Sequence, residues 1–149
     1  MTYITISKDW KQEVRIGLIY SAIFILINLL FPQLTIGFPT QLQSFDSDYL
    51  AAGVFAPIAE EMLFRFWLLN IALAFFSPFL AVLMISLLFS IFHFSAYGAS
   101  LDAQSASFVG AFVFALVVSY IAIKRKSIVI PIVIHAAFNT WLLIRLYYL

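Results

Sequence analysis

The chain has 149 residues, of which 64% are hydrophobic and 10% are charged. A soluble domain of this length could not bury so much apolar side chain, so the composition indicates a membrane protein. The absence of cysteine excludes disulfides, thiolate metal sites and cysteine nucleophiles. The formal net charge is +1, and no basic patch or acidic tail is visible, so we expect the lipid bilayer rather than nucleic acid as a partner.

Long apolar runs predict an all-α membrane protein, because helices satisfy their own backbone hydrogen bonds in lipid. Residues 1–11 are mixed and polar and suit an interfacial lead-in, and two polar segments, 32–48 and 95–107, are predicted to be loops. The chain is expected to form a bundle of about five transmembrane helices, over residues 14–31, 49–76, 78–94, 106–123 and 127–148.

We expect a single domain, 1–149, made of two parts. Residues 1–48 supply the lead-in, the first span and a loop, and residues 49–149 supply a core of four helices. Positive side chains precede the first span and follow the fourth, as the cluster Lys124–Lys126, whereas the two predicted loops contain no Lys or Arg. By the positive-inside rule the N-terminus is cytoplasmic, and we expect a multi-pass protein of a prokaryotic plasma membrane. The sequence leaves the oligomeric state open.

Three ionisable side chains, Glu60, Glu61 and Arg65, interrupt the second apolar run. Charges inside a bilayer are costly, so such a group is by default a functional site whose partners lie nearby. On a helix Glu61 and Arg65 are four residues apart and face each other, whereas Glu60 is rotated by roughly 100°. The spacing predicts a structural ion pair between Glu61 and Arg65 and leaves Glu60 as a carboxylate free to act. The alternative is that Glu60 is a second structural partner of Arg65.

The only two histidines of the chain both fall inside predicted spans. Phe89 and His93 share one helix face, and His135 and Asn139 share another, because each pair is four residues apart. A glutamate, two histidines and an asparagine supply what peptide-bond hydrolysis needs, namely a base, a proton donor for the leaving amine and donors to the oxyanion. Taken singly, His93 at the interface and His135 between helices also have purely structural interpretations.

The three motifs occur in order on successive helices: Glu60-Glu61-x-x-x-Arg65, Phe89-x-x-x-His93 and His135-x-x-x-Asn139. They resemble the motifs of the CAAX-protease and bacteriocin-processing (CPBP, or Abi) family of intramembrane endopeptidases, which includes the type II CAAX prenyl endopeptidases. The resemblance covers about residues 50–140. It departs from many members at Phe66, where they have glycine, and in having one span before the core.

The resemblance implies that residues 49–149 are the catalytic core of an intramembrane protease. Glu60 would activate the attacking water with His93 assisting, and His135 and Asn139 would stabilise the oxyanion. Glu61 and Arg65 would be supporting residues, and Phe89 is expected to pack rather than to react. The substrate would be a peptide or a prenylated protein. The positive-inside rule places the His93 end of the site toward the outside of the cell. A secreted or membrane peptide is therefore kept as an alternative substrate to a prenylated protein.

Metal dependence has two interpretations. Glu60, His93 and His135 form the His₂Glu ligand set of a catalytic zinc, but they come from three helices without an HExxH pair. If Glu60 held a metal, Glu61 would have to act as base while paired with Arg65. We therefore favour catalysis by glutamate without a metal or other cofactor, and zinc is the alternative.

Two other functions fit the same residues. A non-catalytic membrane immunity protein could bind a peptide toxin in the same cavity. A proton-coupled transporter fits less well, because the sequence shows no inverted repeat.

Overall fold

The structure is a computed structural model that describes residues 4–30, 51–96 and 101–148. Within these ranges the regular elements are helices, apart from one isolated bridge between Thr5 and Ser127, so the all-α class is confirmed. The elements are α1 (Trp10–Leu30), η2 (Ala51–Phe55), α2 (Ala56–Glu61), η3 (Met62–Leu68), α3 (Leu69–Phe75), α4 (Pro78–Ala96), α5 (Leu101–Arg125) and α6 (Val129–Tyr148). The loop predicted over 32–48 lies outside the described residues.

The helices lie close to the predicted ranges, although α1 begins at Trp10, inside the predicted lead-in, and α5 begins earlier than expected. The predicted loop 95–107 is wrong for residues 95–96, which still belong to α4, and for residues 101–107, which already belong to α5. These residues are small and polar, which we took as a loop signal, yet alanine and glutamine favour helices and the other residue types there oppose them only weakly. Composition alone therefore places the start of this helix too late.

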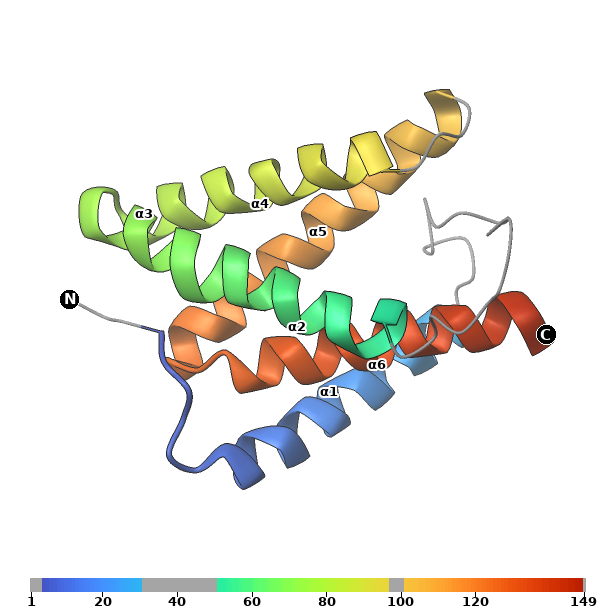
Figure 1. Cartoon of the computed structure of the whole chain (residues 1–149), viewed down its shortest axis with the longest axis horizontal. Helices are drawn as coiled ribbons and strands as arrows, with labels where there is room; N and C mark the ends of the chain where they lie inside the picture. The colour runs from blue at the N-terminus through green and yellow to red at the C-terminus, as the bar shows by residue number, and fades with distance from the viewer. Residues whose placement is uncertain (1–3, 31–50, 97–100, 149) are drawn as a thin grey trace.

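The helix that carries the acidic pair runs from Ala51 to Phe75 as four joined elements (Figure 1). Two of them, η2 and η3, are π-helical, with α2 between them. The joining residues Phe55, Glu61 and Leu68 keep right-handed helical angles, so the chain stays helical through Pro57. A π-helical turn hydrogen-bonds to i+5 and turns the following side chains away from an α-helical register. Such turns occur frequently at functional sites.

Two tight turns connect the later helices. Ser77 and Pro78 begin α4, where the proline occupies the first turn and loses no hydrogen bond. After α5, Lys126 adopts a left-handed conformation with φ of 52°, and the Ser127 N–H donates to the Ala122 carbonyl at 3.2 Å. This is the Schellman arrangement that commonly ends a helix, with lysine in the place usually held by glycine.

The N-terminal segment is bound to the same end of the bundle as these turns. Ile4 is buried, and the Asn70 side chain accepts from its N–H at 2.8 Å and donates to its carbonyl at 2.9 Å. The Thr5 N–H donates to the Lys126 carbonyl, and the Ile128 N–H donates to the Thr5 carbonyl. The end of α3, the α5–α6 turn and the N-terminal segment therefore lie together (Figure 1).

Positive charge is concentrated at this end. Arg125 at the end of α5 forms an ion pair with the buried Glu13 of α1, with 2.6 Å between Nη2 and Oε1. Lys8 and Lys11 lie beside the start of α1, and Lys124 is next to Arg125. The two groups of positive side chains that are separate in the sequence thus belong to one end of the fold.

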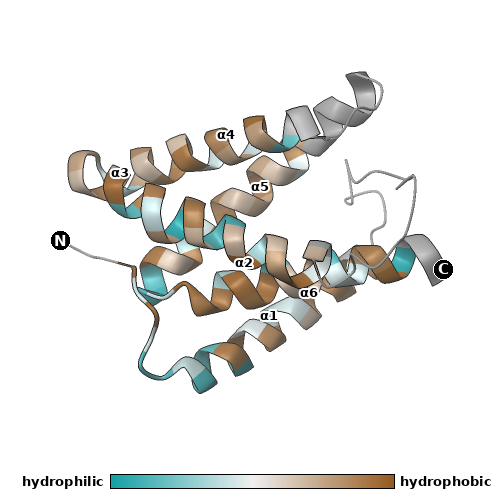
Figure 2. Ribbon diagram, in the orientation of Figure 1, coloured by the Kyte–Doolittle hydropathy of each residue, from teal (hydrophilic) through white to brown (hydrophobic). Residues whose placement is uncertain are grey.

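The outer faces of the helices are apolar, and polar side chains lie inside. Figure 2 shows mostly apolar residues along α4 and α6, and hydrophilic residues at positions along the helix labelled α2. Exposed large hydrophobic side chains recur at helical spacing along α1, α4 and α5: Leu18, Ile19, Ile23, Leu26, Leu83, Leu87, Ile91, Val109, Val113 and Val117. Fully or nearly buried polar ones include Glu61, Arg65, Ser86, Ser90, Ser119 and His135. Buried polar and exposed apolar side chains are the arrangement expected in lipid.

One helix in the described part of the chain is long and apolar enough to cross a membrane, over Phe108–Arg125 of α5. Shorter apolar stretches occupy Pro78–His93 of α4 and Val129–Arg145 of α6.

The helices pack closely where residues are small. A Cβ placed on Gly17 of α1 would come within 2.8 Å of the Val133 Cβ on α6, so these two helices depend on a glycine at their contact.

Candidate active site

The predicted ion pair between Glu61 and Arg65 is present. Arg65 Nη1 donates to Glu61 Oε1 at 3.0 Å, and neither side chain is exposed to solvent. Glu61 is the last residue of α2 and Arg65 lies in η3, so the pair spans the change from α- to π-helical geometry. A buried charge without a partner is strongly destabilising, and this pairing gives both residues a structural role.

The guanidinium of Arg65 lies against aromatic rings. Its Cζ is 4.4 Å from the ring centroid of Phe89 and 6.0 Å from that of Phe64. Phe89 is buried and also packs its ring against that of His93, with 4.1 Å between centroids. Phe89 therefore stabilises a buried cation and positions a histidine, while its own ring has no group that reacts.

Glu60 and the two histidines come together from three helices. Glu60 Oε2 lies 3.6 Å from His93 Nε2 and 3.7 Å from His135 Nε2. Glu60 comes from α2, His93 from α4 and His135 from α6. The Glu60 side chain keeps about a fifth of its surface exposed, whereas that of Glu61 has none. The less buried of the two carboxylates is thus the one that faces both histidines.

Each histidine is held through its other ring nitrogen. His93 Nδ1 lies 3.0 Å from the carbonyl oxygen of Phe89, one turn earlier on the same helix. His135 Nδ1 lies 2.8 Å from Glu61 Oε1, the same oxygen that receives Arg65. The sequence assigned Glu61 to Arg65 alone and missed its contact with His135. Helical spacing cannot reveal it, because the two residues are 74 positions apart.

Asn139 lies one helical turn after His135 on α6 and is partly buried. It therefore shares the His135 face of that helix. The predicted site residues thus occupy three neighbouring helix faces, and the measured distances join Glu60, His93 and His135 to the Glu61–Arg65 pair.

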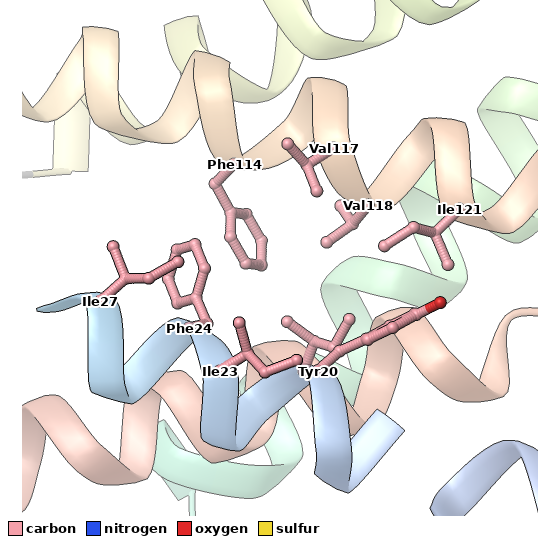
Figure 3. A pocket seen from close by; sticks show the side chains of 9 residues that line it. Tyr20, Ile23, Phe24, Ile27, Phe114, Val117, Val118 and Ile121 are labelled. Atoms are coloured by element: carbon pink, nitrogen blue, oxygen red, sulfur yellow. The ribbon is translucent and has the colours of Figure 1, made fainter. Parts of the chain in front are cut away.

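Phe114 of α5 separates this cluster from an apolar pocket. Its ring centroid is 4.9 Å from that of His135 and 6.2 Å from that of Phe89. On its other side lies a pocket of about 340 Å³ between α1 and α5. Figure 3 shows side chains from the two helices pointing toward each other across it: Tyr20, Ile23, Phe24 and Ile27 from α1, and Phe114, Val117, Val118 and Ile121 from α5. The pocket suits a hydrocarbon group rather than a polar one.

The donor types of Glu60, His93 and His135 match the zinc set weighed from the sequence. Within the described ranges, however, no group of three or more His, Cys, Asp or Glu side chains has the arrangement of a metal site. Metal dependence stays a question for experiment, and the mechanism proposed below is written with the side chains alone.

Residues 43–141 match the family model for the Rce1-like type II CAAX prenyl endopeptidases. The chain belongs to this family. All three motifs fall inside the matched region, so the family resemblance based on them is confirmed. Members are integral membrane proteases, so the fold described above belongs to a membrane protein of a protease family. No curated protein and no solved structure matches the chain.

Proposed function

We propose that the protein is an intramembrane endopeptidase that hydrolyses a peptide bond in or near the bilayer, with Glu60 as the base. The observation that carries this proposal is the position of Glu60 Oε2, 3.6 Å from His93 Nε2 and 3.7 Å from His135 Nε2. Three helices contribute one group each, which is difficult to explain by helix packing alone, since ionisable groups inside a bilayer are expensive. Membership of a protease family supports the same reaction class.

The reaction begins when a water oxygen attacks the scissile carbonyl carbon and Glu60 Oε2 takes a proton from that water. His93 Nε2, beside the same oxygen, holds and orients the water. The negative charge that develops on the carbonyl oxygen is stabilised by His135 and Asn139 on α6. When the C–N bond breaks, the proton held by Glu60 passes to the leaving amine. Two peptides are released, and every side chain returns to its starting state.

Glu61, Arg65 and Phe89 support this site without reacting. The buried Glu61–Arg65 pair connects the end of α2 to η3, and Phe89 covers the guanidinium. No metal or other cofactor takes part in the proposed reaction. The base, the water and the oxyanion donors together complete a hydrolysis without one.

We place the chain in a prokaryotic plasma membrane as five spans with a cytoplasmic N-terminus. The spans are α1, the helix from Ala51 to Phe75, α4, α5 and α6, of which the last four form the catalytic core. This orientation is supported by the position of the positive side chains. The cluster around Arg125 lies at the same end of the bundle as the N-terminal segment and the α3–α4 turn (Figure 1).

The substrate is proposed to be a peptide or protein with an apolar attachment, either a prenyl group or a membrane-embedded segment. The apolar pocket between α1 and α5 supports this choice, because Phe114, which lines it, also contacts the His135 ring, with 4.9 Å between centroids. A hydrocarbon chain in that pocket would hold the adjoining peptide close to Glu60.

The test uses purified protein in lipid nanodiscs with a farnesylated peptide ending in a CAAX sequence and the same peptide without the farnesyl group. Glu60→Gln keeps the shape of the side chain and removes the base, so cleavage should fall by about 10²- to 10⁴-fold. Glu13→Gln is the matched control, because it changes another buried carboxylate far from the histidines and should cleave normally. Cleavage retained by Glu60→Gln would refute Glu60 as the base, and a wild type that cleaves neither peptide would favour the binding alternative.

Metal dependence is tested on the same preparation. Activity should be unchanged by a strong chelator. Loss on chelation and recovery with zinc would show that Glu60, His93 and His135 hold a metal instead.

A further inference from the structure

The acceptor beside each histidine determines which ring nitrogen carries the hydrogen. The Phe89 carbonyl can only accept, so His93 Nδ1, at 3.0 Å, is the donor. The Glu61 carboxylate, paired with Arg65, also only accepts, so His135 Nδ1, at 2.8 Å, is a donor as well. A neutral imidazole carries a single N–H, so the Nε2 atoms that face Glu60 have a lone pair and no hydrogen.

A bare Nε2 changes what His135 can do at the start of the reaction. It cannot donate a hydrogen bond to an oxyanion, because its only hydrogen points to Glu61. It can first accept a proton, and only then can it donate one. Both Nε2 atoms nevertheless lie beside Glu60 Oε2, at 3.6 Å for His93 and 3.7 Å for His135, so a proton taken up by Glu60 is within reach of either ring.

The two histidines differ in what lies behind them. The Nδ1 atom of His93 contacts a neutral backbone carbonyl, whereas that of His135 contacts an ionised carboxylate. A carboxylate stabilises a positive ring through a charge-assisted hydrogen bond, which is roughly twice as strong as a neutral one. The His135 side chain is also nearly buried, with 4% exposed, so solvent cannot provide this support.

We propose that Glu61 is a positioning residue that fixes His135 as its Nδ1–H tautomer and supports the imidazolium formed when Nε2 takes a proton. The catalytic part rests on the proposed function, whereas the tautomer does not. His135 Nε2 then takes over from Glu60 the proton that Glu60 removed from the water, and as the imidazolium it donates a hydrogen bond from Nε2 to the oxyanion. The imidazolium gives this proton to the leaving amine as the C–N bond breaks, so Glu60 and the ring both return to their starting forms. Pairing with Arg65 is thus one of two tasks of Glu61.

The tautomer is measured by NMR of protein labelled with ¹⁵N in its histidines, which are only two. His93→Gln assigns the signals by removing one ring. In the neutral rings of the wild type, both should carry their hydrogen on Nδ1. In Glu61→Gln the side-chain amide can donate as well as accept, so His135 should lose its fixed tautomer while His93 keeps its own. A wild-type His135 with its hydrogen on Nε2 overturns the proposal, whether or not any substrate is cleaved.

The catalytic part is tested by removing both charges of the ion pair together. Glu61→Gln/Arg65→Met leaves no unpaired buried charge, so it should fold even if Glu61→Gln alone is unstable. If Glu61 has a purely structural role, this double variant should be at least as active as Arg65→Met, the single variant that retains Glu61. The positioning role predicts that it stays about 10²- to 10⁴-fold below the wild type with little change in KM. Recovery of kcat in the double variant would refute the positioning role, and an inactive wild type would refute the proposed function instead.

Discussion

Phe89→Leu should destabilise the fold by weakening the environment of a buried cation. Leucine keeps most of the apolar volume but removes the ring that lies 4.4 Å from the Arg65 guanidinium. A desolvated cation–π contact contributes about 2 kcal/mol. The edge-to-face contact with Phe64, at 5.0 Å between centroids, adds ~0.5–1.5 kcal/mol. The expected loss in the free energy of unfolding is therefore about 2.5 to 3.5 kcal/mol.

The measurement is unfolding by SDS in mixed micelles, followed by the fluorescence of the three tryptophans. Phe114→Leu is the matched control, because its ring packs in the same cluster but contacts no guanidinium. This control loses aromatic contacts, so its cost should be the same whether or not the Arg65 guanidinium is present.

A double-mutant cycle isolates the cation–π contribution. In the background Glu61→Gln/Arg65→Met, which has no buried guanidinium, Phe89→Leu should lose most of its effect. An unchanged cost of Phe89→Leu in the charge-free background would show that the Phe89 ring acts only through apolar packing.

Two further predictions concern the packing around the site. Gly17→Ala should destabilise the fold by about 1–3 kcal/mol, because its Cβ would meet the Val133 Cβ at 2.8 Å. Gly53→Ala should cost less, because its Cβ would meet the nearest side-chain atom at 3.1 Å. Equal SDS midpoints for the two variants would contradict this prediction. Asn70→Asp loses the amide that donates to the Ile4 carbonyl at 2.9 Å. The N-terminal segment should therefore become sensitive to protease in this variant and stay protected in the wild type. Equal cleavage rates would show that this amide does not hold the segment.

Features that depend on neighbouring residues could be predicted from the sequence. The four-residue spacing of Glu61 and Arg65 gave an ion pair that the structure contains at 3.0 Å. The same spacing placed His93 and His135 on inward faces, and both lie within 3.7 Å of Glu60 Oε2. The ion pair follows from the rise and rotation of a single helix, and the inward position of the histidines follows from the cost of a polar group in lipid.

Features that depend on how helices meet could not be predicted. The contact of His135 with Glu61 needs the relative rotation of α6 and α2, and residues 74 positions apart carry no periodic signal of it. The π-helical register of η3 depends on packing as well as on local preference, so the sequence predicted a plain helix there. The binding of Ile4 by Asn70 joins a segment predicted to be an interfacial lead-in to the start of α3.

The π-helical segment η3 begins one residue after Glu61, and this position has a consequence for the site. Glu61 Oε1 must receive Arg65 from its own helix and His135 from α6 at the same time, at 3.0 and 2.8 Å. The wider π-helical turn changes the direction of Arg65 relative to an α-helical residue four positions on, while both side chains stay buried. One carboxylate oxygen thus connects the charge that must be neutralised for folding to the histidine that faces Glu60. A variant that restores only the charge balance should therefore recover more of the folding stability than of the catalytic activity.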